Sequence, residues 1–288
     1  MRTAILIIPM LCVSLFVQAQ SISSLYVQGK YSDLWRKEID TELCIYADVA
    51  YIRDSPSPSG NLVDSLSHGH RVKIISEPIY TTENRGFAWP WQKISFLKQG
   101  TTKEGYICNS LLAINNDTDA KGNHFLYGIQ RIIPSTDTIP EIYILEIKAL
   151  DKDLVLINKD TIHIELQDRS LVENKVFGSM GLRGLQSIHR IGFLGEACAI
   201  WTTRYYFGWN GKQFFKLPSR SSMADAAEFY HSEIILFPSE HKLADNIIFK
   251  DTEIGEAIDA MATDVQFKTT RKREKYTWDG KKITLQTN

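Results

Sequence analysis

The sequence predicts an all-β protein: a small N-terminal barrel followed by a second antiparallel β domain. Three observations indicate this class. Short apolar stretches recur between turn residues, residues 162–166 alternate apolar and polar side chains, and Asn-Gly or Asp-Gly turns join neighbouring stretches. Because 43% of the 288 residues are apolar, the chain can also form a sizeable core.

The first twenty residues are predicted to be a secretory signal peptide. Arg2 supplies the positive start, residues 4–17 form the apolar stretch, and Ala19 precedes a suitable cleavage point. The apolar stretch is shorter than the roughly 20 residues that a membrane span needs. We therefore expect an exported protein in the periplasm, the cell envelope or the medium. Contact with the membrane is expected only if Cys12 carries lipid, and Leu11 before it disfavours that processing.

An ordered set of strand and turn motifs lies between residues 41 and 115. A first strand at residues 50–53 is followed by the Ser/Pro-rich loop 54–60, where proline ends strand pairing. Gly69 then turns between two apolar strands, and further strands follow at 91–94 and 105–107. This order resembles the bacterial SH3-like (SH3b) domain, a small β-barrel of exported proteins, over about a quarter of the chain.

The resemblance implies a binding module with no catalytic role, whose partner is cell-wall peptide, glycan or an envelope protein. Ala50 and Tyr106 replace the leucine and the tryptophan usual in the family, so the core should be smaller at Ala50. Aromatic rings offer contact area for extended peptides or sugars, although core packing is the alternative role of each ring. The residues expected to bind the ligand are Tyr51, Arg53, Asp54, Tyr80, Phe87 and Trp89.

The rest of the chain is divided by changes in composition. Residues 21–40 are a lead-in, 116–123 form a polar linker without apolar periodicity, and 124–288 form the C-terminal all-β domain. Within that domain we expect a turn at residues 158–160 between two short strands. We expect a short helix at residues 221–230, favoured by its alanines.

Two similar hairpins are predicted in the C-terminal domain. Trp209-Asn-Gly-Lys and Trp278-Asp-Gly-Lys share one turn signal about seventy residues apart. They resemble hairpins of propeller-like exported repeats, and the alternative is that two unrelated hairpins share good turn chemistry. Because the domain is short for four blades of about 40 residues, a compact sheet or partial repeat is favoured over a full propeller.

Three cysteines follow the predicted signal peptide. Cys44 and Cys108 lie in the first and last strands of the expected barrel, where they could form a disulfide worth roughly 4 kcal/mol on the loop-entropy model. The alternative is two separate buried thiols that act as small apolar groups. Cys198 lies between alanines in a predicted apolar strand and is expected to be buried.

No motif of a catalytic, metal or cofactor site is present in the sequence. The cysteines lack the context of a peptidase nucleophile, and His68 and His70 lack a third metal ligand. With 33 basic against 34 acidic residues, the net charge of −1 gives no reason to expect nucleic acid. We therefore expect a non-enzymatic module without cofactor or metal. The alternative is an envelope hydrolase or inhibitor that acts through the C-terminal β domain.

Overall fold

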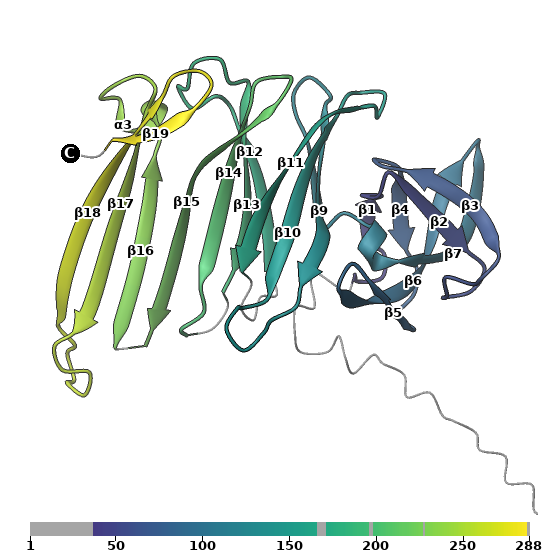
Figure 1. Ribbon diagram of the computed structural model, residues 1–288, viewed down its shortest axis with the longest axis horizontal. Coiled ribbons are helices and arrows are strands. Elements are labelled where there is room, and N and C mark those ends of the chain that lie inside the picture. The colour runs from purple at the N-terminus through teal and green to yellow at the C-terminus, as the bar shows by residue number, and fades with distance from the viewer. Residues whose placement is uncertain (1–36, 166–170, 196–197, 227, 287–288) are drawn as a thin grey trace, which may run out of the picture.

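The computed structural model describes residues 37–165, 171–195, 198–226 and 228–286. Antiparallel strands dominate this part of the chain and stand side by side in an elongated molecule (Figure 1), which confirms the all-β class. Among the described residues, no helix has the length and apolar character required to cross a membrane. The predicted signal peptide, Cys12 and most of the lead-in lie outside the described residues.

The N-terminal unit, residues 37–114, contains one bent sheet. Its elements are β1 (Glu42–Cys44), β2 (Val49–Arg53), β3 (Leu62–Ser67), β4 (Arg71–Ile74), β5 (Thr81–Asn84), β6 (Phe87–Lys98), β7 (Thr101–Cys108) and the 3₁₀ turn η1 (Asn109–Leu111). The strand order is β1-β4-β6-β7-β2-β3, and β5 pairs with the start of β6. The sheet is not the closed barrel of the prediction. The chain passes from β3 to β4 through a tight turn at Gly69 (φ +79°), and no ladder joins these two strands.

The inner face of this sheet encloses a core of its own. Ala50 and Ile52 on β2, and Ile94 and Phe96 on β6, point inward and are at most 3% exposed. Their spacing of two follows from the alternation of side chains along a strand. The outward residues of the same strands are therefore left for other contacts.

A four-stranded sheet follows directly. Its strands are β8 (Asn115–Thr118), β9 (His124–Ile133), β10 (Ile142–Leu150) and β11 (Leu156–Glu165), in the order β11-β10-β9-β8. Residues 116–123 are thus part of a hairpin and not a linker: Asn116 pairs with Leu126, and the Asp119 carboxylate accepts backbone N–H groups of Lys121 and Asn123 in the turn. β8 lies at the sheet edge, where backbone pairing tolerates polar side chains.

The turn predicted at residues 158–160 is wrong. β11 runs through this segment without interruption, and Asn158 pairs with Ala149 while Asp160 pairs with Ile147. The polar residues suit a strand at the edge of its sheet, whose outward face meets solvent.

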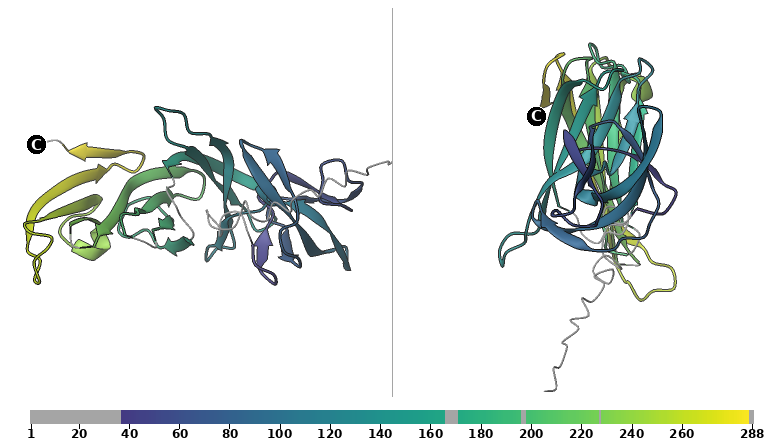
Figure 2. Two further views of the ribbon diagram at one scale, coloured as in Figure 1. Left: turned by 90° about the horizontal axis from the view of Figure 1, so that it is seen from below. Right: turned by 90° about the vertical axis from the view of Figure 1, so that its right-hand side faces the viewer.

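The third sheet has eight strands in chain order and curves along its length (Figure 2). They are β12 (Leu171–Phe177), β13 (Ser187–Leu194), β14 (Thr202–Trp209), β15 (Phe214–Asp225), β16 (Phe229–Leu236), β17 (Ile247–Ala257), β18 (Phe267–Trp278) and β19 (Ile283–Gln286); α3 (Pro238–His241) follows β16. The helix predicted at residues 221–230 is wrong, because this segment forms the β15–β16 hairpin. There Ser222 pairs with Ser232, so the ladder overrides the helix propensity of the alanines.

Both predicted Trp-Asn/Asp-Gly-Lys hairpins form, and their turns have the same geometry. Trp209 pairs with Phe214 across one turn, and Trp278 pairs with Ile283 across the other. In each turn the Asn210 or Asp279 side chain accepts two backbone N–H groups at 2.7–2.9 Å. The following glycines adopt φ values of +95° and +96°, a backbone region open mainly to glycine.

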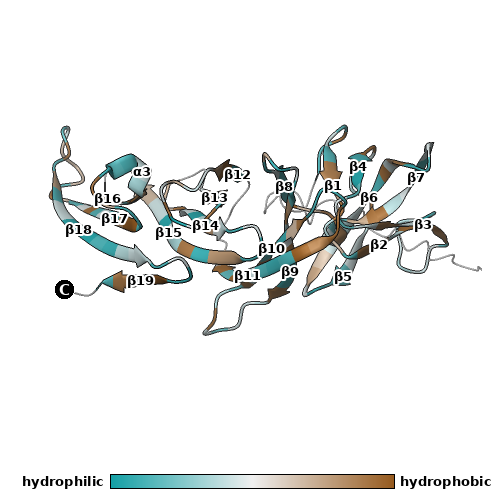
Figure 3. Cartoon of the chain, turned by 90° about the horizontal axis from the view of Figure 1, so that it is seen from above, coloured by the Kyte–Doolittle hydropathy of each residue, from teal (hydrophilic) through white to brown (hydrophobic). Residues whose placement is uncertain are grey.

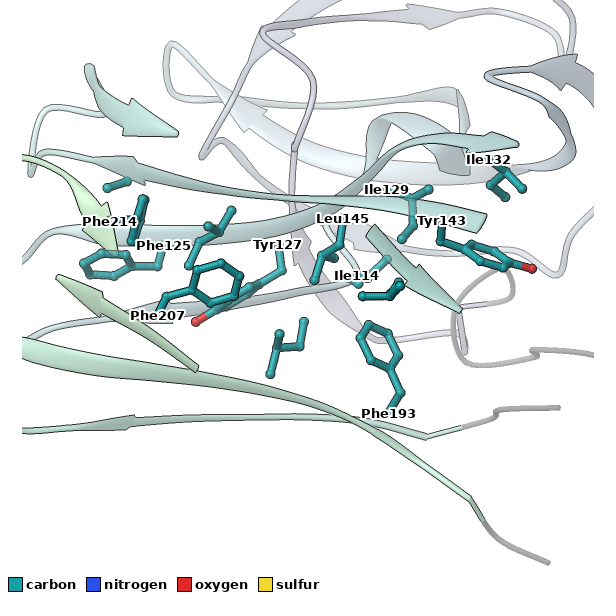
Figure 4. Close-up of a cluster of buried hydrophobic side chains, with 14 of the residues drawn as sticks. Ile114, Phe125, Tyr127, Ile129, Ile132, Tyr143, Leu145, Phe193, Phe207 and Phe214 are labelled. Carbon is teal, nitrogen blue, oxygen red and sulfur yellow. The ribbon is translucent and has the colours of Figure 1, made fainter. Parts of the chain in front are cut away.

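The largest core lies between the four-stranded sheet and strands β13–β15 (Figure 4). Phe125, Tyr127 and Leu145 from the smaller sheet pack against Phe193 and Phe207 from the larger one. A separate core on the larger sheet gathers residues of β13–β18 with the loop before β13, including Tyr206, Leu217 and Trp278. Burial on both sides explains why the end of β14, residues 205–209, is continuously apolar.

The other face of the four-stranded sheet packs on the N-terminal unit through a junction centred on Tyr46. Gly128 lies under the Tyr46 ring, and a Cβ there would be 2.3 Å from a ring carbon. The Tyr46 hydroxyl donates to Glu146 at 2.8 Å, while Lys148 Nζ lies 3.7 Å from Glu146 and 2.7 Å from Asp48. These charges are complementary, and burial together with the neighbouring Glu146 raises the pKa of Tyr46.

Candidate functional site

The structure brings three of the predicted ligand residues together at one end of β2. Tyr51 is 52% exposed, and the Arg53 guanidinium carbon lies 5.6 Å from the centre of its ring. Arg53 also donates to the carbonyl oxygen of Gly60 at 3.1 Å, so the loop after β2 holds this side chain in place. A cation above an aromatic face is a common element of recognition surfaces.

The Asp54 carboxylate is engaged in hydrogen bonds within its own loop. Its carboxylate accepts the backbone N–H of Asn61 at 2.9 Å and the Asn61 side-chain amide at 2.7 Å, and it also accepts the Ser55 hydroxyl. These hydrogen bonds, with the Asn61 amide first, lower the pKa of Asp54. Asp54 therefore fixes the loop, while Tyr51 and Arg53 remain available at its mouth.

Exposed apolar side chains continue from Tyr51 along the outward face of β2 and β3. Val49 is 52% exposed, and Leu62, which pairs with Arg53, is 56% exposed. We call Val49, Tyr51, Arg53 and Leu62 the outer strip. Its two strands are joined by an antiparallel ladder with one register shift, between Ile52 and Arg53, and this pairing supports the strip.

The remaining predicted aromatic residues lie elsewhere. Trp89 is only 2% exposed and belongs to the core beneath the four-stranded sheet, with the half-buried Phe87 ring 5.7 Å away. Trp89 is therefore not part of a ligand surface, because residues of the four-stranded sheet pack against this side of the N-terminal unit. Tyr80 is 45% exposed but precedes β5, which pairs with β6 and not with β2.

Of the two alternatives for Cys44 and Cys108, the structure shows separate buried thiols, whereas Cys198 departs from the prediction. Cys44 and Cys108 are both buried with free thiols and belong to different core clusters, so no disulfide joins them. Burial raises the pKa of both thiols. Cys198 is exposed in the turn before β14 and not buried in a strand as predicted, because β14 begins four residues later.

The histidines predicted to lack a metal partner have protein partners. His68 Nε2 lies 3.1 Å from the carbonyl oxygen of Leu154, and His70 Nε2 lies 3.0 Å from that of Leu97. Within the described ranges, no three His, Cys, Asp or Glu side chains are placed to hold a metal ion.

A row of buried, hydrogen-bonded side chains, which no sequence motif indicated, lies between the two C-terminal sheets. Ser187 Oγ is 2.9 Å from His189 Nε2, His189 Nδ1 is 3.4 Å from the Tyr127 hydroxyl, and that hydroxyl donates to Asp117. Burial lowers the pKa of His189 to about 4, so the ring is neutral at pH 7. The Ser-x-His spacing on a strand was the available signal, but Tyr127 and Asp117 come from another sheet.

Ser187 also borders a cavity of about 370 Å³ at the end of this two-sheet core. Asp119 and Lys121 of the β8–β9 turn and Phe177 of β12 line the same space. Ser187 itself is only 5% exposed, and His189 is fully buried behind it. Comparison of the chain with protein-family models, curated proteins and solved structures gives no match.

Proposed function

We propose that this chain is an exported, non-enzymatic binding protein whose SH3-like N-terminal unit binds cell-wall peptide or glycan through the outer strip. The observation that carries the proposal is the half-exposed Tyr51 ring beside Arg53 on a pair of hydrogen-bonded strands. Export rests on the character of residues 1–20.

The chemistry of the outer strip suits an extended, partly polar ligand. Val49 and Leu62 offer apolar contact, Tyr51 offers a flat face with a hydroxyl, and Arg53 offers donors for a carboxylate or carbonyl group. A few such anchors commonly supply most of the binding free energy of a recognition surface. Tyr51 is therefore the residue whose loss should weaken binding most.

The test is a saturation pull-down of the chain from Ser21 onward on purified bacterial cell wall. We expect Tyr51→Ala to weaken binding about tenfold without changing the melting temperature, because the ring is half exposed. Ile234→Ala is the matched control: Ile234 is 49% exposed on β16, far from the outer strip in the chain's fold (Figure 1). Equal binding by the wild type and the Tyr51 variant would contradict the proposal.

An envelope hydrolase acting through the C-terminal domain is the second candidate, and the Ser187–His189 pair favours it. Ser187 Oγ would attack an ester carbonyl while His189 Nε2 takes its proton, and that proton would then pass to the leaving alcohol. Water, deprotonated by the same nitrogen, would release the acyl group. Labelling by a fluorophosphonate that is lost in Ser187→Ala would support this candidate. A folded wild type that takes up no label would exclude it.

A further inference from the structure

One rung of the eight-stranded sheet places two arginines directly opposite each other. The rung runs from Glu173 on β12 through Gly192 on β13 to Arg204 on β14 and Arg220 on β15. Like charges that face each other across neighbouring strands repel and destabilise the pair. We call these four residues the arginine rung.

A single carboxylate serves the guanidinium groups at this place. Glu173 accepts Arg204 Nε at 2.5 Å and lies 3.3 Å from Arg190 Nη2 on β13. Gly192 makes this close approach possible, since a Cβ there would fall 2.8 Å from Glu173 and 3.1 Å from Arg204. Arg190 and Arg204 are 16% and 22% exposed, so their positive charge is only partly screened by water.

The Arg220 side chain has neither a hydrogen bond nor an ion pair with any described residue, and its Nε atom is buried. Its two Nη groups likewise have no acceptor in the part of the chain that the structure describes. A partly buried guanidinium without an acceptor loses hydration that no protein group replaces. Three arginines and one carboxylate leave an excess of positive charge on this face of the sheet.

Hydroxyl groups line the next rung on the same face. Thr202 and Ser222 lie two residues from Arg204 and Arg220, and Ser222 pairs with Ser232 on β16. These three residues line a groove of about 580 Å³ that continues to Tyr230. Hydroxyl donors beside a pair of guanidinium forks are a suitable lining for an oxyanion.

We propose that the arginine rung is a binding site for an oxyanion group, a carboxylate or phosphate, carried by a ligand that lies in the adjoining groove. The planar fork of Arg220 donates to two oxygens of the group, and its negative charge removes the repulsion between Arg204 and Arg220. The Thr202, Ser222 and Ser232 hydroxyls contact the rest of the ligand. This site is independent of the outer strip and of the cell-wall proposal.

The test measures the melting temperature of the full chain at constant ionic strength while chloride is replaced by inorganic phosphate or by glucuronate. Arg220→Gln removes the fork. Arg271→Gln is the matched control, because Arg271 lies on the same sheet and already pairs with Glu253 at 2.7 Å. We expect a saturable rise of about 3 °C at ten times the dissociation constant for the wild type and the control. The rise should be absent from Arg220→Gln.

The two anions separate the possible sources of the group. A rise with glucuronate alone assigns an anionic sugar or another carboxylate, whereas a rise with phosphate alone assigns a phosphorylated ligand. No rise with either anion, or an equal rise in Arg220→Gln, would overturn the proposal. It would also be overturned if Arg220→Gln melted below the wild type in chloride, because Arg220 would then stabilise the fold without an anion.

Discussion

The Tyr46 junction and the arginine rung are both partly buried groups of charges, but only at the junction does each charged side chain lie near an opposite charge. At the junction, Lys148 faces the carboxylates of Glu146 and Asp48, and the Tyr46 hydroxyl supplies a further donor. At the rung, Arg204 faces Arg220, whose guanidinium has no acceptor among the described residues. A balanced set of charges indicates a structural role, whereas an unmatched charge held in place by a sheet indicates that a ligand supplies the missing partner.

The same eight-stranded sheet shows how its exposed charges are normally arranged. Strand β18 is mostly hydrophilic (Figure 3), and its arginines each face a carboxylate on β17. Arg273 donates twice to Asp251 at 2.6 Å, and Arg271 donates to Glu253 at 2.7 Å. Complementary pairs are therefore the pattern at this end of the sheet, and the arginine rung departs from it.

The largest expected effect is at the junction. Lys148→Ala leaves Glu146, whose side chain is 3% exposed, with Lys159 as its one remaining ion-pair partner among the described residues. The free energy of unfolding should therefore fall by about 3–5 kcal/mol. Urea denaturation measures this loss. The double variant Lys148→Met with Glu146→Gln should lose less, because it removes both buried charges. A loss below about 1 kcal/mol in Lys148→Ala would show that the junction charges do not hold the two parts together.

A second effect concerns the neutral buried chain around His189. The pKa of His189 is about 4 in the folded protein, below the usual 6.5 of an unfolded chain. Between pH 4 and pH 6.5 the unfolded protein therefore binds a proton at this histidine that the folded protein does not. The stabilising contribution is fully present above pH 6.5 and falls by up to about 3 kcal/mol as the pH approaches 4. In His189→Gln, the slope of the unfolding free energy against pH should decrease in this range by the equivalent of about one bound proton. An unchanged slope in the variant would mean that other groups cause the loss.

The smallest effect is expected on β18. Arg273→Gln breaks the exposed pair with Asp251 and should lower the melting temperature by only about 1–3 °C, since exposed ion pairs contribute little. High salt should reduce the difference further. Arg220→Gln should show no loss of melting temperature in chloride. This difference between two arginines on one sheet would sharpen the comparison of paired and unpaired charges. A melting temperature of Arg220→Gln below that of the wild type in chloride would break it.

The sequence could predict features whose signal is local. The Asn210-Gly and Asp279-Gly turns set their hairpins without help from distant residues, and the alternation of side chains along a strand accounts for the outward position of Tyr51 between Ala50 and Ile52. By contrast, the polar strand β8 and the alanine-rich end of β15 owe their strand conformation to neighbours in the sheet.

The candidate sites were less accessible to sequence analysis. Trp89 has the sequence context of a surface aromatic. The four-stranded sheet, whose residues follow Trp89 in the sequence, covers this side chain. The arginine rung depends on the register of β12–β15, which brings Glu173, Arg204 and Arg220 into line from nearly fifty residues of chain. A bulge between Arg204 and Tyr206 sets this register, and no pattern in a single sequence predicts it.

The most direct measurement follows the Arg220 Nε–H resonance by nuclear magnetic resonance while phosphate or glucuronate is added to the full chain. Comparison with Arg220→Gln assigns the signal. We predict that this resonance shifts in a saturable way with at least one of the two anions, while the signals of Arg271 and Arg273, which already have carboxylate partners, stay in place. Equal movement of all three signals, or no movement at Arg220, would contradict the claim that the arginine rung is an incomplete site which a ligand completes.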